Sequence, residues 1–389
     1  MITVIADDIT GAAEIAGICL RYGLKVTFGI DTVPNVDADV CVVTTDSRSG
    51  TELEAYRTHY QLAKTIYKKP ESIVFKKCDS VLRGYVLTEL SALLDVKKFK
   101  KIVLQPSNPA SGRCIRDGIY YVGNEEIEKT DFAGDPDFPA TFSEVQKLLL
   151  SRSSKYNHIT EFQTATLSGV SGDGIYVPDC TSVEKLIKDS KQLDIATLLC
   201  GSAAFFEQVL IKTFSPTEPR VQPGSFSMDN FLLISGSTQS ASRTSGNEPT
   251  EKKCPIVAFP AALLQVKTEK GTLEAFAEEL YKLWAQNNTL ILTVSEKKIV
   301  FPGSSTILKQ RMGQIVKLLV KNCDIKELFI EGGATTYSVL KDLNCKTLIP
   351  VEELSPGVVR MEIPDSPTLH LTIKPGSYSW PEQITGLFS

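Results

Sequence analysis

The sequence predicts an α/β protein of two domains, each with a largely parallel sheet, and three observations lead to this prediction. The 389 residues exceed the roughly 250 to 300 residues that one hydrophobic core organises. Short β-branched runs alternate with longer amphipathic segments, which is the pattern of crossover units in a parallel sheet. A stretch rich in Pro, Ser and Gly, residues 214–225, separates two halves. We place the boundary near Gly224, giving domains at 1–224 and 225–389 with a cleft between them for a small molecule.

In the first half, each short apolar run rich in β-branched residues is assigned to a strand and each longer amphipathic segment to a helix. The helices that join successive strands are long enough to cross the sheet, so we expect the strands to be parallel. In chain order we expect strand 3–6, helix 12–22, strand 26–30, strand 40–45, helix 53–67, strand 73–76, helix 85–94 and strand 101–105.

The second half repeats the alternation, so we expect another layered α/β structure there. In chain order the expected elements are strand 230–235, strand 255–259, helix 273–286, strand 290–294, helix 305–321, strand 327–331 and helix 337–343.

The composition excludes several classes of function. Hydrophobic residues make up 42% of the chain and the net charge is −4, so no global positive field favours nucleic acid or anionic lipid. No run approaches the roughly 18 to 20 apolar residues of a membrane span, and two acids follow the first few apolar residues, so we expect a cytoplasmic protein. Nine scattered cysteines without a CxxC pair, and only three histidines, predict reduced thiols rather than disulfides or zinc.

In an open parallel sheet, ligands bind beyond the carboxyl ends of the strands, and the first strand ends in paired carboxylates. Asp7 and Asp8 are followed by Thr10 and Gly11 at the start of a helix. One acid is explained as a helix N-cap. Because the second acid is surplus to capping, we favour a general base or a metal ligand at this position.

Three further strand ends in the first half carry cations beside hydroxyl groups. Arg forks and Lys ammonium groups suit a carboxylate or phosphate ligand, and an aspartate suits sugar hydroxyls. Each segment alone is also compatible with an exposed ion pair of little energetic value, but together they favour a binding edge. The segments are residues 44–48, 76–84 and 105–113.

The second half has glycine and hydroxyl residues at three expected strand ends, residues 235–238, 331–336 and 374–377. Glycine lets backbone amides approach a phosphate, and a following helix N-terminus adds favourable partial charge. Glycine is also needed in ordinary turns. No GxxxxGK[ST] and no GxGxxG occurs, which excludes a Walker loop and disfavours a dinucleotide fold.

Taken together, these segments resemble the four-carbon acid sugar kinase family along nearly the whole chain. In the first half, the similar segments are ADDITGA (6–12), TDSRS (45–49), KKCDSVLRG (76–84) and PSNPASGR (106–113). VPDC (177–180) and CGSAAF (200–205) are similar to further segments that we interpret as structural. In the second half, the similar segments are GST (236–238), EGGATT (331–336) and KPGS (374–377).

The resemblance implies an ATP- and magnesium-dependent kinase that phosphorylates the terminal hydroxyl of threonate, erythronate or a 3-oxo-tetronate. The implied substrate-binding residues are Asp8, Arg48, Lys77, Cys78, Asp79 and Ser80. The implied nucleotide-binding residues are Ser237, Gly332, Gly333, Ala334, Thr335 and Gly376. We add Asp7, Arg83 and Arg113 to the substrate site because their charges fall in the same motifs. No metal-ligating residue is assigned.

As a mechanism, we expect Arg48 and Lys77 to hold the substrate carboxylate. Asp8 then orients and deprotonates the attacking hydroxyl, with Asp7 and Asp79 as alternatives. Catalysis of phosphoryl transfer depends mainly on positioning the reactants and neutralising charge. Amide-rich loops, a magnesium ion and domain closure are therefore sufficient to catalyse the reaction.

Two other functions remain open from the sequence. One is a non-catalytic sugar-acid sensor that has lost nucleotide turnover, because the last loop reads Lys-Pro-Gly-Ser-Tyr-Ser where relatives commonly read KPGNFG. The other is a nicotinamide-dependent oxidoreductase, which the missing glycine fingerprint disfavours. The expected partners are the sugar acid, ATP and a second copy of the chain in a homodimer, with no nucleic acid and no membrane.

Overall fold

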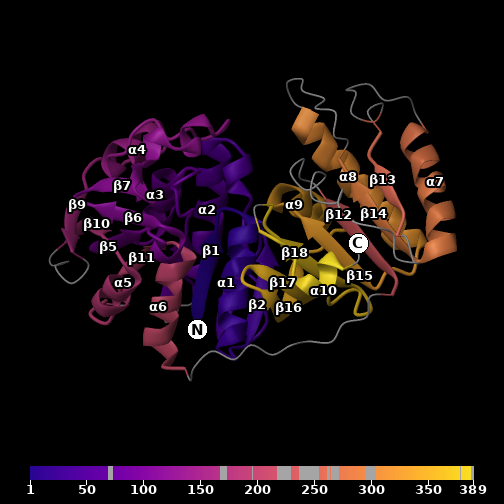
Figure 1. The fold of residues 1–389 in the computed structure, drawn as a ribbon. Coiled ribbons are helices and arrows are strands. Elements are labelled where there is room, and N and C mark those ends of the chain that lie inside the picture. The colour runs from indigo at the N-terminus through magenta and orange to yellow at the C-terminus, as the bar shows by residue number, and fades with distance from the viewer. Residues whose placement is uncertain are drawn as a thin grey trace. The chain divides into compact units, whose positions relative to one another are not determined.

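The computed structural model describes residues 1–68, 73–166, 173–194, 196–216, 229–235, 254–260, 263, 271–294, 304–376 and 378–386. The chain divides into two compact units, Met1–Arg220 and Val221–Ser389, drawn in indigo to rose and in orange to yellow in Figure 1. The boundary expected near Gly224 lies outside the described residues. Both units contain helices and mostly parallel strands, so the predicted α/β class with two domains is confirmed.

The first unit is organised by a parallel sheet with the strand order β2-β3-β1-β4-β11-β5-β10-β9. Its strands are β1 (Ile2–Ala6), β2 (Val26–Ile30), β3 (Val40–Thr44), β4 (Ile73–Lys77), β5 (Lys101–Gln105), β9 (Gln163–Thr166), β10 (Gly174–Asp179) and β11 (Leu198–Gly201). Ala6 of β1 pairs with Thr44 of β3 and with Lys77 of β4. These three neighbouring strands therefore end level with one another, and the polar segments that follow them start at one edge of the sheet.

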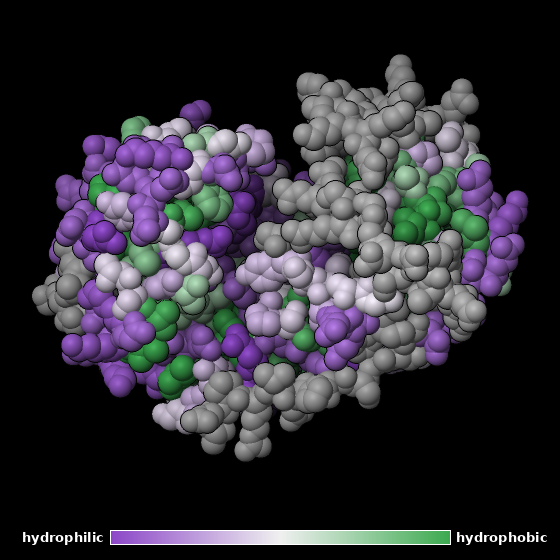
Figure 2. Space-filling view, in the orientation of Figure 1, coloured by the Kyte–Doolittle hydropathy of each residue, from purple (hydrophilic) through white to green (hydrophobic). Residues whose placement is uncertain are grey.

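Helices cover this sheet and bury its apolar side chains. They are α1 (Ile9–Arg21), α2 (Glu52–Ile66), α3 (Val86–Val96), α4 (Val145–Ser151), α5 (Val183–Ser190) and α6 (Ala203–Phe214). Helices α2 and α3 contact each other, and α1 contacts α6. Every residue of β1, β2 and β3 is buried, as expected for parallel strands covered on both faces. The face of this unit visible in Figure 2 is mostly hydrophilic, with hydrophobic residues in small groups.

A small antiparallel sheet follows β5 and was not predicted from the sequence. It consists of β6 (Arg113–Arg116), β7 (Ile119–Val122) and β8 (Glu125–Glu126). The 3-10 helices Ile127–Lys129 and Asp131–Gly134 and then α4 come next. We call residues 113–160 the antiparallel insert. Its strands are too short to produce a clear alternation of polar and apolar residues.

The second unit has its own sheet, with the order β13-β14-β12-β15-β18-β17-β16. The parallel strands are β12 (Phe231–Ser235), β13 (Ile256–Ala258), β14 (Thr289–Thr293), β15 (Glu327–Glu331) and β18 (His370–Lys374). Strands β16 (Thr347–Ser355) and β17 (Val358–Glu362) form an antiparallel hairpin that continues to β18. The helices of this unit are α7 (Thr272–Asn287), α8 (Ser304–Asn322), α9 (Gly333–Asp342) and α10 (Glu382–Thr385).

All the strands and helices expected from the sequence are present, most of them with shifted ends. The helix expected at 12–22 begins at Ile9, because Asp8 caps it. The helix expected at 337–343 begins at Gly333, directly after Gly332 turns the chain with a φ of 97°. Both corrections bring a helix N-terminus next to a strand end. Among the described residues, no helix combines the length and apolar character needed to cross a membrane.

Candidate functional site

The turn between β1 and α1 uses its two aspartates differently. Asp8 has an extended backbone and caps α1, since its Oδ1 accepts a hydrogen bond from the Gly11 N–H at 3.2 Å and its Oδ2 accepts one from the Thr10 hydroxyl. The capping interpretation therefore holds for Asp8. The Asp7 side chain is only 1% exposed and takes no part in the cap.

Arg48, in the 3-10 turn Ser47–Ser49 after β3, contacts three aspartates that follow the ends of β1 and β4. Its Nε donates to Asp7 Oδ2 at 2.8 Å, and its Nη2 donates to Asp8 Oδ1 at 3.0 Å. Its Nη1 lies 3.7 Å from Asp79 Oδ1. The three carboxylates and the guanidinium, named here the aspartate cluster, are brought together by the adjacent ends of β1, β3 and β4.

The electrostatic environment shifts the pKa values of the three carboxyl groups in different directions. Burial raises the pKa of Asp7, although Arg48 and Lys76 act in the opposite direction. Burial would also raise the pKa of Asp8, but Arg48 and Lys77 outweigh it and lower that pKa. For Asp79, Arg48 and Arg83 together overcome burial and hold the pKa well below its usual range. Asp8 and Asp79 are therefore ionised at neutral pH, whereas Asp7 holds a proton more readily.

Asp79 organises the segment that follows β4, residues 78–84, which we name the substrate loop after the role that the sequence analysis expects of it. Its Oδ2 accepts hydrogen bonds from the backbone N–H groups of Val81 at 3.3 Å and Arg83 at 3.2 Å. The Arg83 guanidinium donates to both carboxylate oxygens, at 2.9 and 3.0 Å. The oxygens of Asp79 are thus occupied by the loop itself and by Arg48.

Lys77 and Arg113 are the other cations that the fold brings to this edge. Lys77 is 4% exposed, and its Nζ donates to the Cys78 carbonyl at 2.8 Å. A Cβ added to Gly11 would lie 3.1 Å from this Nζ and 2.6 Å from Asp8 Oδ1, so Lys77 is beside Asp8. Arg113 donates to the Ser80 hydroxyl. Neither cation forms a close ion pair with an aspartate among the described residues, unlike Arg48 and Arg83.

Cys78 is in the expected segment, but its side chain is not presented to a ligand. It is 0% exposed and packs in the hydrophobic core of the first unit. Its backbone N–H donates to the Gly201 carbonyl of β11 at 2.9 Å. If Cys78 contributes to substrate binding, it does so by positioning the backbone around it and not through its thiol.

A buried charged network beneath the aspartate cluster was missed by the sequence analysis. Lys76 and Glu89, each 0% exposed, form an ion pair with Nζ 2.9 Å from Oε2. The Ser47 hydroxyl donates to Glu89 Oε1 at 2.6 Å, and the Nε2 atom of His59 lies 3.9 Å from Glu89 Oε2. The signal in the sequence was a single Glu within the mostly apolar α3 and a Lys on an interior strand.

Glu14 on α1 was also missed. Burial raises its pKa, with Lys77 acting in the opposite direction and Asp8 acting with burial. It comes one helical turn after Gly11, so the helical period alone placed it on the same face as the start of α1. Among the described residues, no cluster of three or more metal-ligating side chains is present.

In the second unit, the strands that precede the three glycine segments end at one edge of the sheet. Ser235, Glu331 and Lys374 are the final residues of β12, β15 and β18, and they pair in one row. Gly332, Gly333, Ala334 and Thr335 form the turn into α9 and its first residues, and Gly376 follows β18 on the neighbouring strand. Ser237 lies outside the described residues.

The last residues of β15 and β18, which precede these glycines, form a second buried ion pair. Lys374, 1% exposed, has its Nζ 3.1 Å from Glu331 Oε1, and the Ser235 hydroxyl donates to Glu331 Oε2 at 3.2 Å. The Lys374 Nζ also donates to the carbonyls of Pro375 at 2.9 Å and Tyr378 at 2.6 Å. Lys374 therefore ties both sides of the segment that contains Gly376 to the end of β18.

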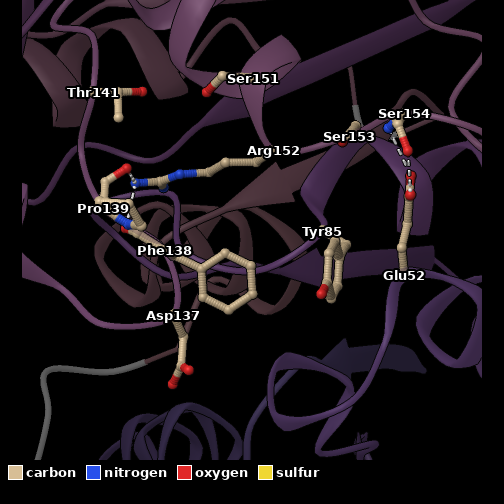
Figure 3. A pocket seen from close by; sticks show the side chains of 10 residues that line it. All are labelled: Glu52, Tyr85, Asp137, Phe138, Pro139, Thr141, Ser151, Arg152, Ser153 and Ser154. Carbon is tan, nitrogen blue, oxygen red and sulfur yellow. Dashed lines mark hydrogen bonds between the residues drawn. The ribbon is translucent and has the colours of Figure 1, made fainter.

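A cavity of about 340 Å³ lies in the first unit, close to the substrate loop (Figure 3). The Arg152 guanidinium in this view points to the backbone of Phe138 and Pro139, and Glu52 accepts hydrogen bonds from Ser154. The lining residues are Glu52, Tyr85, Asp137, Phe138, Pro139, Thr141, Ser151, Arg152, Ser153 and Ser154. None of the residues expected in the substrate site lines this cavity.

Comparisons with known proteins assign a family model to each half. The model described as a sugar-binding N-terminal domain matches residues 2–209, and the model described as a nucleotide-binding C-terminal domain matches residues 232–378. A D-threonate kinase of Salmonella typhimurium is 24% identical, over 94% of this chain and 93% of its own length. A 3-oxo-tetronate kinase of Pseudomonas savastanoi is 21% identical, over 96% and 93%. A D-erythronate kinase of Heliobacterium modesticaldum is 32% identical, but over only 39% of this chain and 36% of its own.

Two solved structures share the fold. A Haemophilus influenzae protein aligns with a TM-score of 0.72 at 17% identity, covering 100% of both chains. A Salmonella typhimurium protein aligns with a TM-score of 0.76 at 20% identity, covering 97% of this chain and 96% of its own. These likenesses show that the two-unit architecture is shared along the full length of the chain.

Proposed function

The chain belongs to the four-carbon acid sugar kinase family, and from this premise we propose that it phosphorylates the terminal hydroxyl of a four-carbon sugar acid with ATP. The candidate acids include threonate and 3-oxo-tetronate, since proteins named as kinases of these two acids align with nearly the whole chain. Erythronate is a third candidate, since a protein named as a D-erythronate kinase aligns with 39% of the chain. The observation that supports the proposal best is that Asp8, in the aspartate cluster, lies beside Lys77, a cation that forms no close ion pair with an aspartate among the described residues.

The substrate carboxylate is held by Lys77 and Arg113 in this proposal. Arg48 was first expected to share this role, but its guanidinium already contacts Asp7, Asp8 and Asp79. We therefore assign Arg48 to organising the carboxylates. Arg83 is 34% exposed and bound to Asp79, so it closes the rim of the site, and Ser80 offers a hydroxyl beside Arg113.

Asp8 is the group that orients and deprotonates the attacking hydroxyl. Its side chain is 15% exposed, against 1% for Asp7 and 10% for Asp79, and the oxygens of Asp79 are used by the substrate loop. A lowered pKa makes Asp8 a weak base, but it keeps the carboxylate ionised and able to accept a hydrogen bond. Phosphoryl transfer passes through a loose transition state that requires positioning more than strong base catalysis.

The nucleotide phosphates bind to the loops of the second unit. The N–H groups at the start of α9, from Gly333, Ala334 and Thr335, have no partner within the helix. Among the described residues, no atom lies within 4 Å of a Cβ placed at Gly332 or Gly376, so both positions leave space for a phosphate. Ser237 is assigned to the same site by its motif.

Magnesium accompanies the nucleotide in this proposal. Mg²⁺ in kinases is bound through one or two carboxylates plus the phosphates rather than by a protein cage. This fits the described residues, which contain no cluster of three metal-ligating side chains but place the partly exposed Asp8 in the site. When bound, the ion neutralises phosphate charge.

A coupled assay of ADP release across isomers of threonate, erythronate and 3-oxo-tetronate tests the function, with 31P NMR to identify the product. We expect one acid to be converted to its 4-phosphate. Absence of any phosphorylated product would refute the kinase assignment. Calorimetry that then shows binding of an acid, but not of ATP with Mg²⁺, would support a sugar-acid sensor instead.

A further inference from the structure

Arg152, at the end of α4 in the antiparallel insert, holds the backbone of the substrate loop from outside the aspartate cluster. Its Nη1 donates to the carbonyls of Leu82 and, at 3.2 Å, Val81. Its Nη2 donates to the carbonyls of Phe138 at 2.8 Å and Pro139 at 3.2 Å (Figure 3). One side chain therefore joins the loop that contains Asp79, Ser80 and Arg83 to a different part of the fold.

The substrate loop has a backbone conformation that needs such support. Leu82 has a φ of 63° and Gly84 a φ of 91°, and a left-handed conformation is unfavourable for a leucine because its Cβ crowds the following carbonyl oxygen. The Asp79 carboxylate accepts hydrogen bonds from two backbone N–H groups of this loop, those of Val81 and Arg83. Arg152 binds carbonyls of the same turn, those of Val81 and Leu82. The Asp79 carboxylate thus holds the backbone N–H groups of the strained turn, and the Arg152 guanidinium holds its backbone carbonyls.

The chemistry of Arg152 differs from that of a residue that only fills space. No described carboxylate lies within ion-pair distance of it, and all four of its partners are carbonyl oxygens. Burial lowers its pKa to about 10, while Asp79 and Asp135 act in the opposite direction. An apolar side chain would fill the same volume without this desolvation cost. What it would not supply is a set of donors aimed at the loop.

Other contacts from the insert reach the same loop. The Tyr120 hydroxyl donates to the Ser80 carbonyl, and Asp135 Oδ2 lies 3.5 Å from Arg83 Nη1. The rings of Tyr85 and Phe138 meet edge to face at 5.3 Å. The insert therefore surrounds the substrate loop, and Arg152 is the member that binds the backbone at the left-handed turn.

We propose that Arg152 is a positioning residue for the sugar acid, which sets Asp79, Ser80 and Arg83 in place by fixing the carbonyls of Val81 and Leu82. This inference rests on the proposed function of the same site. Arg152 touches no reacting atom in this role. Its loss is expected to affect binding of the acid and not binding of the nucleotide, whose assigned residues belong to the second unit.

The test compares Arg152→Ala and Arg152→Lys with Arg116→Ala, a control at an exposed arginine of the insert that stacks on Tyr121. We expect Arg152→Ala to raise KM for the acid roughly 10- to 100-fold, the scale of a site misplaced by about 1 Å, with KM for ATP unchanged. Arg152→Lys, which keeps the charge but not the fork of donors, should give an intermediate KM. Arg116→Ala should match the wild type.

Hydrogen exchange without ligands gives a readout that does not depend on activity. Amides of residues 78–85 should exchange faster in both Arg152 variants, and those of the second unit should not change. An acid KM within twofold of the wild type in both variants, or an equal rise in both KM values, would overturn the proposal. If the wild type phosphorylates no acid, the proposed function fails, and hydrogen exchange still decides whether Arg152 orders the loop.

Discussion

Arg48 Nη2 lies 2.7 Å from Asp7 Oδ2, and the Arg48 backbone N–H donates to the Asp7 carbonyl at 3.2 Å. The first residue beyond β1 and the turn beyond β3 are therefore tied by both main chain and side chain. The same guanidinium also reaches Asp8 and Asp79. Because three carboxyl groups share one half-buried guanidinium, the ionisation of each depends on Arg48.

Replacing Arg48 with Met should leave these carboxylates without their shared cation. We expect the free energy of unfolding to fall by about 3 to 5 kcal/mol at pH 7.5, as for other buried pairs that lose one partner. The loss should be smaller at pH 5, where the carboxylates take up protons more readily. Urea denaturation at the two pH values measures this, with the exposed Arg57→Met as control. Equal stability of Arg48→Met and wild type would contradict the arrangement.

Asp8→Asn tests the catalytic assignment with little disturbance of the fold. Asn caps helices about as well as Asp, so the melting temperature should stay close to that of the wild type. The variant loses the charge that accepts the hydroxyl proton, and kcat should fall by about two to four orders of magnitude. Steady-state kinetics with saturating acid and ATP measures the effect, and a kcat close to normal would remove Asp8 from this role.

Gly11→Ala distinguishes the effect of this residue on the stability of α1 from its effect on activity. In an ordinary helix this change stabilises by about 1 kcal/mol. Here the added methyl group would lie 2.6 Å from Asp8 Oδ1 and 3.1 Å from Lys77 Nζ, so both side chains must move. We expect kcat/KM for the acid to fall more than about tenfold. Gly134→Ala, where no atom in the described part of the chain lies within 4 Å of the added Cβ, should be unaffected, and full activity of Gly11→Ala would show that the two side chains adapt.

Gly376→Ala probes the nucleotide loops without straining them. The position has no left-handed φ, and no atom of the described residues lies within 4 Å of an added Cβ, so the melting temperature should not change. If the phosphates approach the backbone here, the methyl group blocks them, and KM for ATP should rise about tenfold, equivalent to roughly 1.4 kcal/mol. KM for the acid serves as the internal control. An unchanged KM for ATP would place the nucleotide away from this loop.

His59 should make stability depend on pH. Burial, reinforced by Lys76, lowers its pKa from 6.5 to about 4, with Glu89 acting in the opposite direction. As the pH falls, the unfolded chain takes up a proton on His59 at a higher pH than the folded chain does. The free energy of unfolding is therefore at its full value above pH 6.5 and decreases as the pH falls towards 4. The expected loss is on the order of 3 kcal/mol. His59→Gln should lack this slope in urea denaturation, whereas the half-exposed His158→Gln should keep it.

Glu89 should cause a further fall in the free energy of unfolding at lower pH, both in the wild type and in His59→Gln. Its pKa is lowered to about 2 by Lys76 and His59, which outweigh burial. Its contribution is present above the unfolded pKa of about 4.5 and lost below it. The two groups are therefore distinguished by their pH ranges. A wild-type curve that is flat between pH 6.5 and 4.5 would contradict the assignment to His59.

Much of the architecture follows from local patterns. Alternating β-branched and amphipathic segments predicted the parallel strands, because each strand and its crossover helix are encoded by neighbouring residues. The antiparallel insert was missed because β6, β7 and β8 are too short to show a period. The start of α9 was missed because the turn at Gly332 depends on its φ of 97°, which a glycine permits but does not require.

By itself, the sequence determined that Asp7, Asp8, Arg48, Lys77 and Asp79 lie near one another, because parallel strands end at a common edge and their last residues can be read from the chain. Only the tertiary structure decided how these groups are used. The Cys78 side chain is buried in the core, Arg48 is bound by aspartates, and Asp8 is the most accessible carboxylate of the cluster. Burial and pairing depend on segments far apart in the sequence, such as Arg152 and Leu82, separated by 70 residues. No local pattern encodes such contacts.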